Sequence, residues 1–274
     1  MTPGVREWLG DPALPWLHFA HATGMCAEIY AELLEPLAND FNIVASDARG
    51  HGRSPLPADP AAMTSWRIYE DDLAALLAIY SGGPWVLAGH SMGGTVSLGL
   101  AAGRLGIARA IVLVEPAFVP FALAPSFTRG PPNPMAEQAA KRRSVFPNRD
   151  AARDNWRGRG VFRDWSEASL DAYVRGALRE RSDGQVELAC APAWEAATFI
   201  AVATDAEASL AAWQGPLALL HGTRSSTVTQ ADADAFAARG TVERIEGASH
   251  FLPLEHPERV RAAIRAAAAL PDRA

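Results

Sequence analysis

The sequence predicts an α/β fold in which helices cover both faces of a mostly parallel sheet. Three observations lead to this prediction. Short β-type runs alternate with segments of helix length along much of the chain, a glycine-flanked turn joins one apolar run to a small-residue helix, and one long stretch interrupts the alternation. Strands that alternate with helices are typical of parallel sheets with helices on both sides.

The elements follow from apolar runs, their length and the turn residues between them. The segments expected to be strands are 14–20, 41–46, 84–88, 108–114, 216–220 and 241–245. The segments expected to be helices are 28–38, 65–80, 93–105, 206–213, 229–238 and 257–269.

The interruption covers residues 116–204, which open with proline-rich loops and continue as helical segments without convincing strands. We expect a helical cap here, inserted after the strand that ends near residue 114. Residues 1–115 and 205–274 then form the core domain. Because ligands of open α/β sheets bind beyond the carboxyl ends of the strands, the cap should roof the site and select the substrate.

Composition and charge narrow the function classes. The chain has 274 residues and a formal net charge of −6, which gives no electrostatic reason to expect nucleic acid or an anionic membrane as partner. Residues 73–103 carry no Asp, Glu, Lys or Arg, but glycine, serine and proline at 81–84 break the run, so a buried core explains it better than a membrane span. We therefore expect a small-molecule substrate as the partner, and we leave a homodimer open.

The start of the chain indicates where the protein is located, and the number of cysteines indicates whether disulfides are expected. The start of the chain lacks the basic and apolar regions of a signal peptide, so a cytoplasmic location is expected. Cys26 and Cys190 are too few for a disulfide framework and are expected to be small buried thiols.

The most informative motif is Gly89-His90-Ser91-Met92-Gly93, which follows an apolar run and precedes a helix. A serine on a sharp strand-to-helix turn needs neighbours without side chains, and it presents its hydroxyl beyond the strand end. The N–H of Met92 then lies at the positive end of a helix, where it can stabilise a developing oxyanion. The motif predicts a nucleophilic serine, Ser91.

Four segments together make the chain similar to the capped α/β-hydrolases, over essentially its whole length. They are His21-Ala22-Thr23-Gly24, the segment 47–54 (Asp-Ala-Arg-Gly-His-Gly-Arg-Ser), Gly89-His90-Ser91-Met92-Gly93-Gly94, and Gly247-Ala248-Ser249-His250-Phe251. The resemblance implies a serine hydrolase without a cofactor. Haloalkane dehalogenases and epoxide hydrolases have an aspartate at the nucleophile position, so their chemistry is not expected here.

The resemblance also implies roles for single residues. His250 would be the general base for Ser91, and the N–H groups of Thr23 and Met92 would form the oxyanion hole. His21 would shape the oxyanion loop and His90 would be held beside the nucleophile. The remaining histidines are expected to be structural, namely His18, His51, His221 and His256.

The acid of the triad departs from the common pattern. In the family an aspartate usually stands three residues after the glycine that corresponds to Gly222. This chain has Ser225 at that position, and a neutral hydroxyl cannot stabilise an imidazolium. Glu115 follows an apolar run directly, a position that holds the acid in relatives such as the haloalkane dehalogenases. We expect Glu115 to be the acid. Two alternatives stay open. The acid could be Asp232 or Asp234, both of which the pattern assigns to an exposed helix, or the site could be a dyad without an acid.

The function follows from the triad and the cap. We expect hydrolysis of an ester or thioester of a small apolar or aromatic substrate through an acyl-enzyme. A carbon–carbon bond hydrolase or lyase acting on a carboxylated substrate is a second hypothesis, and a non-enzymatic ligand receptor a third. The segment 141–163 is rich in arginine, which indicates either solvated helix faces or recognition of a carboxylate or coenzyme A phosphate. No histidines or carboxylates recur at metal-ligand spacing, so no metal site is expected.

Overall fold

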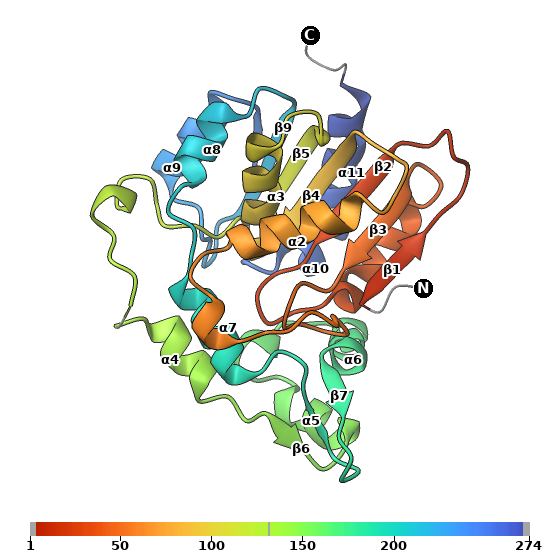
Figure 1. Cartoon of the computed structure of the whole chain (residues 1–274), viewed down its shortest axis with the longest axis vertical. Helices are drawn as coiled ribbons and strands as arrows, with labels where there is room; N and C mark the ends of the chain where they lie inside the picture. Colours follow the sequence, from red (N-terminus) through yellow and green to blue (C-terminus); the bar gives the residue numbers. More distant parts are fainter. Residues whose placement is uncertain (1–3, 131, 271–274) are drawn as a thin grey trace.

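A seven-stranded sheet forms the centre of the structure, a computed structural model that describes residues 4–130 and 132–270 (Figure 1). Its strands are β1 (Val5–Trp8), β2 (Trp16–Ala20), β3 (Asn42–Ser46), β4 (Trp85–His90), β5 (Ala108–Val114), β9 (Leu217–Gly222) and β10 (Thr241–Ile245). Their order across the sheet is β1-β3-β2-β4-β5-β9-β10. β1 pairs antiparallel with β3, and the other neighbouring strands are parallel. The predicted α/β fold with a mostly parallel sheet is confirmed.

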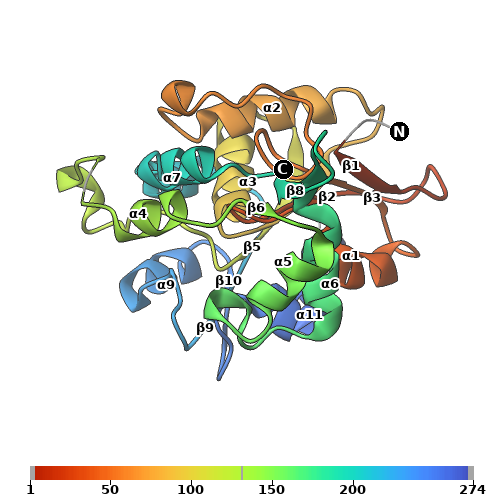
Figure 2. The same ribbon diagram turned by 90° about the horizontal axis from the view of Figure 1, so that it is seen from below.

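Helices cover both faces of this sheet. Those outside residues 116–204 are α1 (Ala31–Leu34), α2 (Arg67–Leu77), α3 (Met92–Gly103), α8 (Ala206–Ala212), α9 (Gln230–Ala237), α10 (Leu252–Glu255) and α11 (Pro257–Ala269). α2 and α3 lie on one face, whereas α1 and α11 lie on the other (Figures 1 and 2). The uncharged run 73–103 is divided among the end of α2, β4 and α3, and within the described residues no helix is long and apolar enough to cross a membrane.

Two large buried clusters form the core of the sheet domain, one on each face of the sheet, and a small third cluster of Ala136, Ala139 and Ala196 lies between α4 (Pro134–Ala140) and α7 (Pro192–Ile200). Alternate residues of β4 belong to different clusters: Val86 and Ala88 to one, Trp85 and Leu87 to the other. This follows from the strand's two-residue period, and burial on both faces explains why β4 is an unbroken apolar run. Cys26 and Cys190 are both buried free thiols, as predicted.

Two of the predicted elements near the N-terminus are corrected. β1 was not expected, because it is four residues long, carries Arg6 and Glu7 and is only half-buried at the sheet edge. The single helix expected over 28–38 is wrong. The four-residue α1 is flanked by 3-10 turns at Ala27–Tyr30 and Glu35–Leu37. Pro36 lies in the second turn, and its missing N–H cannot continue an α-helical ladder.

Residues 116–204 lie between β5 and α8 and gather at one end of the sheet (Figures 1 and 2). We call this segment the insertion. Its helices are α4 (Pro134–Ala140), α5 (Arg149–Trp156), α6 (Glu167–Gly176) and α7 (Pro192–Ile200). It also holds a three-stranded antiparallel sheet of β6 (Val145–Phe146), β8 (Val186–Leu188) and β7 (Leu178–Glu180).

The expectation of an insertion without strands is therefore wrong. Strands of two or three residues are too short to produce an alternating pattern that a sequence window can detect. The remaining 3-10 turns of the described chain are Pro60–Ala62, Ala124–Ser126 and Gly160–Phe162. The ranges 1–115, 116–204 and 205–274 expected as domains also include residues 1–3, 131 and 271–274, which lie outside the described residues.

Candidate active site

Ser91 lies on the sharp turn between β4 and α3, as its motif predicts. Its backbone has φ 54° and ψ −121°, a region that non-glycine residues rarely adopt. A Cβ on Gly89 would lie 2.4 Å from the carbonyl carbon of Gly93, and a Cβ on Gly93 would lie 2.2 Å from the carbonyl oxygen of Ala20. Both glycines are therefore needed for the close approach that keeps the turn in place.

The structure brings His250 between Ser91 and Glu115. Its Nε2 lies 3.1 Å from the Ser91 Oγ, and its Nδ1 lies 3.2 Å from Glu115 Oε2. His250 stands in the turn after β10, directly before α10. These distances are at the long end of hydrogen bonds, as is common before a substrate tightens a catalytic site.

Glu115 is the first residue after β5 and is completely buried. Its backbone also has a positive φ, 48°, and its N–H donates to the carbonyl oxygen of Leu220 over 2.9 Å. Burial alone would raise the pKa of this carboxyl. Hydrogen bonds from His250 and from the N–H groups of Gly222 and Thr227 outweigh burial and hold the Glu115 pKa below its usual value. A carboxylate at this position is consequently ionised at neutral pH.

The loop after β9 supplies most of the hydrogen bonds to that carboxylate. Gly222 N–H donates to Oε1 over 2.6 Å, while the Ser226 hydroxyl and the Thr227 N–H donate to Oε2 over 3.1 and 3.0 Å. Ser225 itself, in the position where the resemblance leads one to expect an aspartate, has φ 51°, and within the described residues its side chain makes no hydrogen bond to Glu115 or His250. The roles of Gly222, Ser226 and Thr227 were not predicted from the sequence. The signal that could have found them is a loop that has Ser and Thr in place of the expected aspartate, because such a loop offers hydrogen-bond donors to a carboxylate from another strand.

The two aspartates left open by the sequence are placed elsewhere. Asp232 is buried, so the expectation that it lies on an exposed helix face is wrong. Its oxygens cap the start of α9 through Thr229 and accept the N–H of Phe121 over 3.0 Å. Asp234 is exposed and accepts a hydrogen bond from Gln230. Within the described residues, His250 has no hydrogen bond to either aspartate.

Thr23 and Met92, the predicted oxyanion donors, lie side by side. The Thr23 hydroxyl contacts the Met92 sulfur over 3.4 Å, and both residues are buried. Met92 is the first residue of α3, where a helix leaves its N–H groups without intrahelical acceptors. The two residues thus come from separate segments, the loop after β2 and the first turn of α3, and their side chains are in contact.

Two buried histidines hold the loop that carries Thr23. His21 donates from Nδ1 to the carbonyl oxygen of Ala22 and accepts the N–H of Ala48 on Nε2. His51 accepts the N–H of Gly24 on Nε2 over 3.0 Å, and burial lowers its pKa to about 3, so the ring is neutral. The contribution of His51 to this loop was not foreseen, because it comes from a residue distant in sequence.

His90 connects the loop that carries Thr23 with the loop that carries His250. Its Nε2 lies 2.7 Å from the carbonyl oxygen of His250, so this nitrogen carries the proton. Its Nδ1 then accepts from the Tyr30 hydroxyl over 2.8 Å, and Tyr30 in turn accepts the N–H of Ala22. Burial lowers the pKa of His90 well below its usual value, so a neutral ring is fixed in one tautomer.

A cavity of about 440 Å³ lies under the insertion and reaches Thr23 beside the candidate site, although neither Ser91 nor His250 lines it. Half of its lining residues are apolar or aromatic, including Met25, Trp156, Phe162 and Phe199. Apolar walls with a few polar groups are typical of small-molecule sites. Charged side chains also line it; they are Arg142, Arg143, Arg159 and Glu195.

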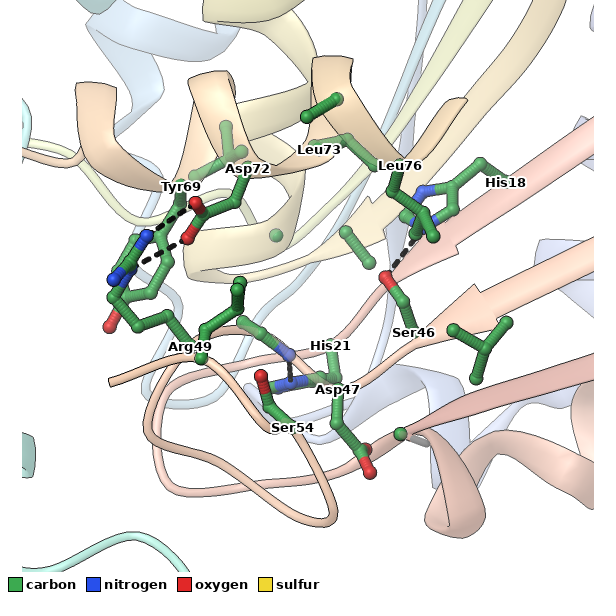
Figure 3. A pocket seen from close by; sticks show the side chains of 18 of the residues that line it. His18, His21, Ser46, Asp47, Arg49, Ser54, Tyr69, Asp72, Leu73 and Leu76 are labelled. Atoms are coloured by element: carbon green, nitrogen blue, oxygen red, sulfur yellow. Dashed lines mark hydrogen bonds and ion pairs between the residues drawn. The ribbon is translucent and has the colours of Figure 1, made fainter. Parts of the chain in front are cut away.

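A second cavity, of about 260 Å³, lies between α2 and the strands β2 and β3 (Figure 3). His18 and Ser46 are hydrogen-bonded to each other at its wall, and Arg49 and Asp72 form an ion pair over 2.6 Å. Met92 contributes to its lining but Ser91 does not. In the described ranges no three His, Cys, Asp or Glu side chains are grouped so that they could hold a metal ion.

Curated relatives match parts of the chain. Lipase LipV of Mycobacterium tuberculosis is 46% identical over 80 residues, which is 28% of either chain. The 2-(acetamidomethylene)succinate hydrolase of Mesorhizobium japonicum is 30% identical over 121 residues, 44% of this chain and 41% of the relative. The chain thus spans between about a quarter and two-fifths of the length of these relatives.

Similarity of fold extends further. A crystal structure of E-2-(acetamidomethylene)succinate hydrolase superposes with a TM-score of 0.81 at 22% identity and covers 97% of this chain and 94% of that one. The model of the alpha/beta hydrolase family matches residues 19–263, which include Thr23, Ser91, Glu115 and His250. The chain belongs to the alpha/beta hydrolase family.

Proposed function

We propose that this protein is a serine hydrolase that cleaves a carboxylic ester or thioester through an acyl-enzyme. The observation that carries the proposal is the hydrogen-bonded series from Ser91 through His250 to the buried Glu115. A nucleophile, a base and an acid that orients the base are the arrangement that acyl transfer requires. The partial relatives named lipase and hydrolase are consistent with it.

The chemistry follows from this order. His250 Nε2 takes the proton of Ser91 as the Oγ attacks the carbonyl carbon, and the N–H groups of Thr23 and Met92 stabilise the resulting oxyanion. The proton then passes from His250 to the leaving alcohol or thiol as its bond to carbon breaks. Water then attacks the acyl carbon as it gives a proton to His250, and His250 returns that proton to the Ser91 Oγ as the bond from Oγ to the acyl carbon breaks and the acid leaves. The ionised Glu115 stabilises the imidazolium in both halves of the reaction.

The cavity under the insertion supports a small apolar or aromatic acyl group. Trp156, Phe162 and Phe199 offer ring surfaces, and Met25 lies near the oxyanion loop. In this proposal the insertion is the cap that selects the substrate.

A fluorophosphonate probe tests the proposal directly. Intact-mass analysis should find one adduct on the wild-type chain, and none on Ser91→Ala or His250→Ala. Ser225→Ala is the matched control, because this serine is exposed and, within the described residues, its side chain makes no hydrogen bond to His250 or Glu115, and it should react like wild type. A burst of p-nitrophenol from a p-nitrophenyl ester should accompany the adduct. A wild-type chain that reacts with neither reagent would contradict the proposal.

A carbon–carbon bond hydrolase acting on a carboxylated substrate is the second candidate. The arginines that line the cavity favour it, since such substrates are anionic. It would use Ser91 and His250 to move protons, and quenched-flow mass analysis with a vinylogous diketo acid would then find product without an acyl-enzyme.

A further inference from the structure

The cavity under the insertion carries an excess of positive charge. Its charged lining consists of three arginines and one glutamate, in a chain whose formal net charge is −6. The same cavity reaches Thr23, whose N–H is a proposed oxyanion donor. A ligand that places its reacting carbonyl at Thr23 therefore extends into a region that favours anions.

The glutamate is already neutralised within the protein. Glu195 accepts a hydrogen bond from Arg142 over 2.6 Å, and the two side chains are 8% and 23% exposed. Arg142 also donates to the Tyr173 hydroxyl over 2.9 Å. Burial would lower the pKa of Arg142, but Tyr173 and Glu195 outweigh it and raise this pKa, so the guanidinium stays charged. Arg142 and Glu195 thus form a fixed ion pair without net charge.

Arg143 and Arg159 keep their charge uncompensated. Arg143 donates from Nε to the carbonyl oxygen of Val145 over 3.0 Å, and its guanidinium lies 4.7 Å from the centre of the Phe146 ring. These contacts hold the side chain without using a carboxylate. In the described part of the chain, neither arginine has an ion pair and the Arg159 side chain has no hydrogen bond. Both side chains are exposed, and apart from the Arg143 Nε–H their guanidinium N–H groups are available to a ligand of the cavity.

We propose that Arg143 and Arg159 bind a carboxylate that the substrate carries at the end opposite its reacting carbonyl. This inference rests on the proposed function for the place of that carbonyl. The substrate class is then the ester or thioester of a molecule with a second, free carboxyl group. Guanidinium groups recognise carboxylates through paired N–H donors, and the apolar walls accommodate the carbon chain between the two ends.

Matched pairs of esters test this inference. One pair places the carboxylate on the acyl group: mono-p-nitrophenyl glutarate against p-nitrophenyl pentanoate. The other places it on the alcohol: 4-acetoxyphenylacetate against 4-methylphenyl acetate. Hydrolysis without enzyme is subtracted for each. We expect kcat/KM to be higher for the anionic member of one pair, and the pair that shows this identifies which side of the substrate enters the cavity.

The variants are Arg143→Gln, Arg159→Gln and the double variant. Each single change should lower kcat/KM for the preferred anionic ester about fivefold, the upper range for an ion pair in contact with water. The neutral ester should change less than about twofold, because its interactions do not involve these charges. Arg163→Gln is the control, since this exposed arginine lies nearby in sequence but does not line the cavity. The anionic preference should also fall as salt screens the charges.

Two results would overturn the inference while leaving the hydrolase proposal intact. One is an equal kcat/KM for the anionic and neutral members of both pairs, and the other is an anionic preference that the double variant retains. If no ester is cleaved, the hydrolase proposal fails and binding decides the inference. Saturation-transfer NMR with monomethyl glutarate supports it if transfer occurs with wild type and is lost in the double variant. Absence of transfer with wild type overturns it.

Discussion

Thr227 donates its backbone N–H to Glu115 Oε2 over 3.0 Å, and its hydroxyl lies 3.2 Å from the same oxygen. The carbonyl oxygens of Glu115 and Pro116 lie 3.1 and 3.0 Å from that hydroxyl and share it. Thr227 and Glu115 are 112 positions apart in sequence. β5 and β9 pair in parallel with Val114 opposite Leu220, so the residue after β5 comes next to the loop that follows β9. The loop in which the resemblance leads one to expect an aspartate instead holds the carboxylate of Glu115 in its charged form.

Replacing Thr227 with valine should destabilise the fold by about 1–2 kcal/mol at pH 7, because a buried carboxylate loses a hydroxyl donor. The lowered pKa of Glu115 means that this stabilisation is present above the pKa of the unfolded chain and is lost as pH falls through the folded one. Urea unfolding at pH 7 and pH 4 should therefore show a deficit that shrinks at the lower pH. Thr64→Val is the control, because this threonine is exposed and its hydroxyl has no hydrogen bond in the described residues, and it should cost less than about 0.5 kcal/mol. A deficit that grows on acidification would contradict this account.

Glu115→Gln should lower kcat about a thousandfold or more, because a neutral amide cannot stabilise the imidazolium of His250. The variant should keep its fold, since the amide has nearly the same shape. Asp234→Asn is the matched control and should retain wild-type kcat, as this exposed aspartate does not contact His250. Steady-state kinetics on a p-nitrophenyl ester measures both. Unchanged turnover of Glu115→Gln would remove Glu115 from the triad and return attention to a Ser-His dyad.

Tyr30→Phe should lower kcat about tenfold with a smaller effect on KM, because a buried hydrogen-bond partner of His90 is lost. His90 holds the carbonyl oxygen of His250, so its displacement misplaces the base while leaving the cavity unchanged. Tyr80→Phe, whose hydroxyl bonds to Glu7 far from the site, is the control. A rise in KM at constant kcat would show that Tyr30 acts on substrate binding instead.

Gly93→Ala should destabilise the protein by about 3 kcal/mol or more, because its Cβ would collide with backbone that cannot easily move. The nearest atom would be the carbonyl oxygen of Ala20 at 2.2 Å. Gly103→Ala in the same helix meets no heavy atom within 4 Å and should raise stability by about 0.5–1 kcal/mol, through the better helix propensity of alanine. Thermal and urea unfolding should separate the two variants in opposite directions. A Gly93→Ala chain as stable as wild type would refute the steric argument.

The sequence by itself determined the class of fold and the residues that meet at the candidate site. The turn around Ser91 is encoded locally, since its conformation requires glycine at 89 and 93 within a few residues. The apolar run of β5 likewise defines where the turn at Glu115 begins, whereas His250 was assigned through the resemblance carried by residues 247–251. Ser91, Glu115 and His250 were accordingly named from the sequence, and their catalytic roles stay a prediction for the kinetic variants.

Only the tertiary structure decided how these residues are supported. The hydrogen bonds of Glu115 to Gly222, Ser226 and Thr227 depend on the register of two strands more than 100 residues apart, which no local pattern contains. The fixed pair of Arg142 with Glu195, and the uncompensated Arg143 and Arg159, likewise depend on how the insertion packs. Local sterics fix turns and strand ends, whereas the partners of a buried charge are chosen by packing between distant segments.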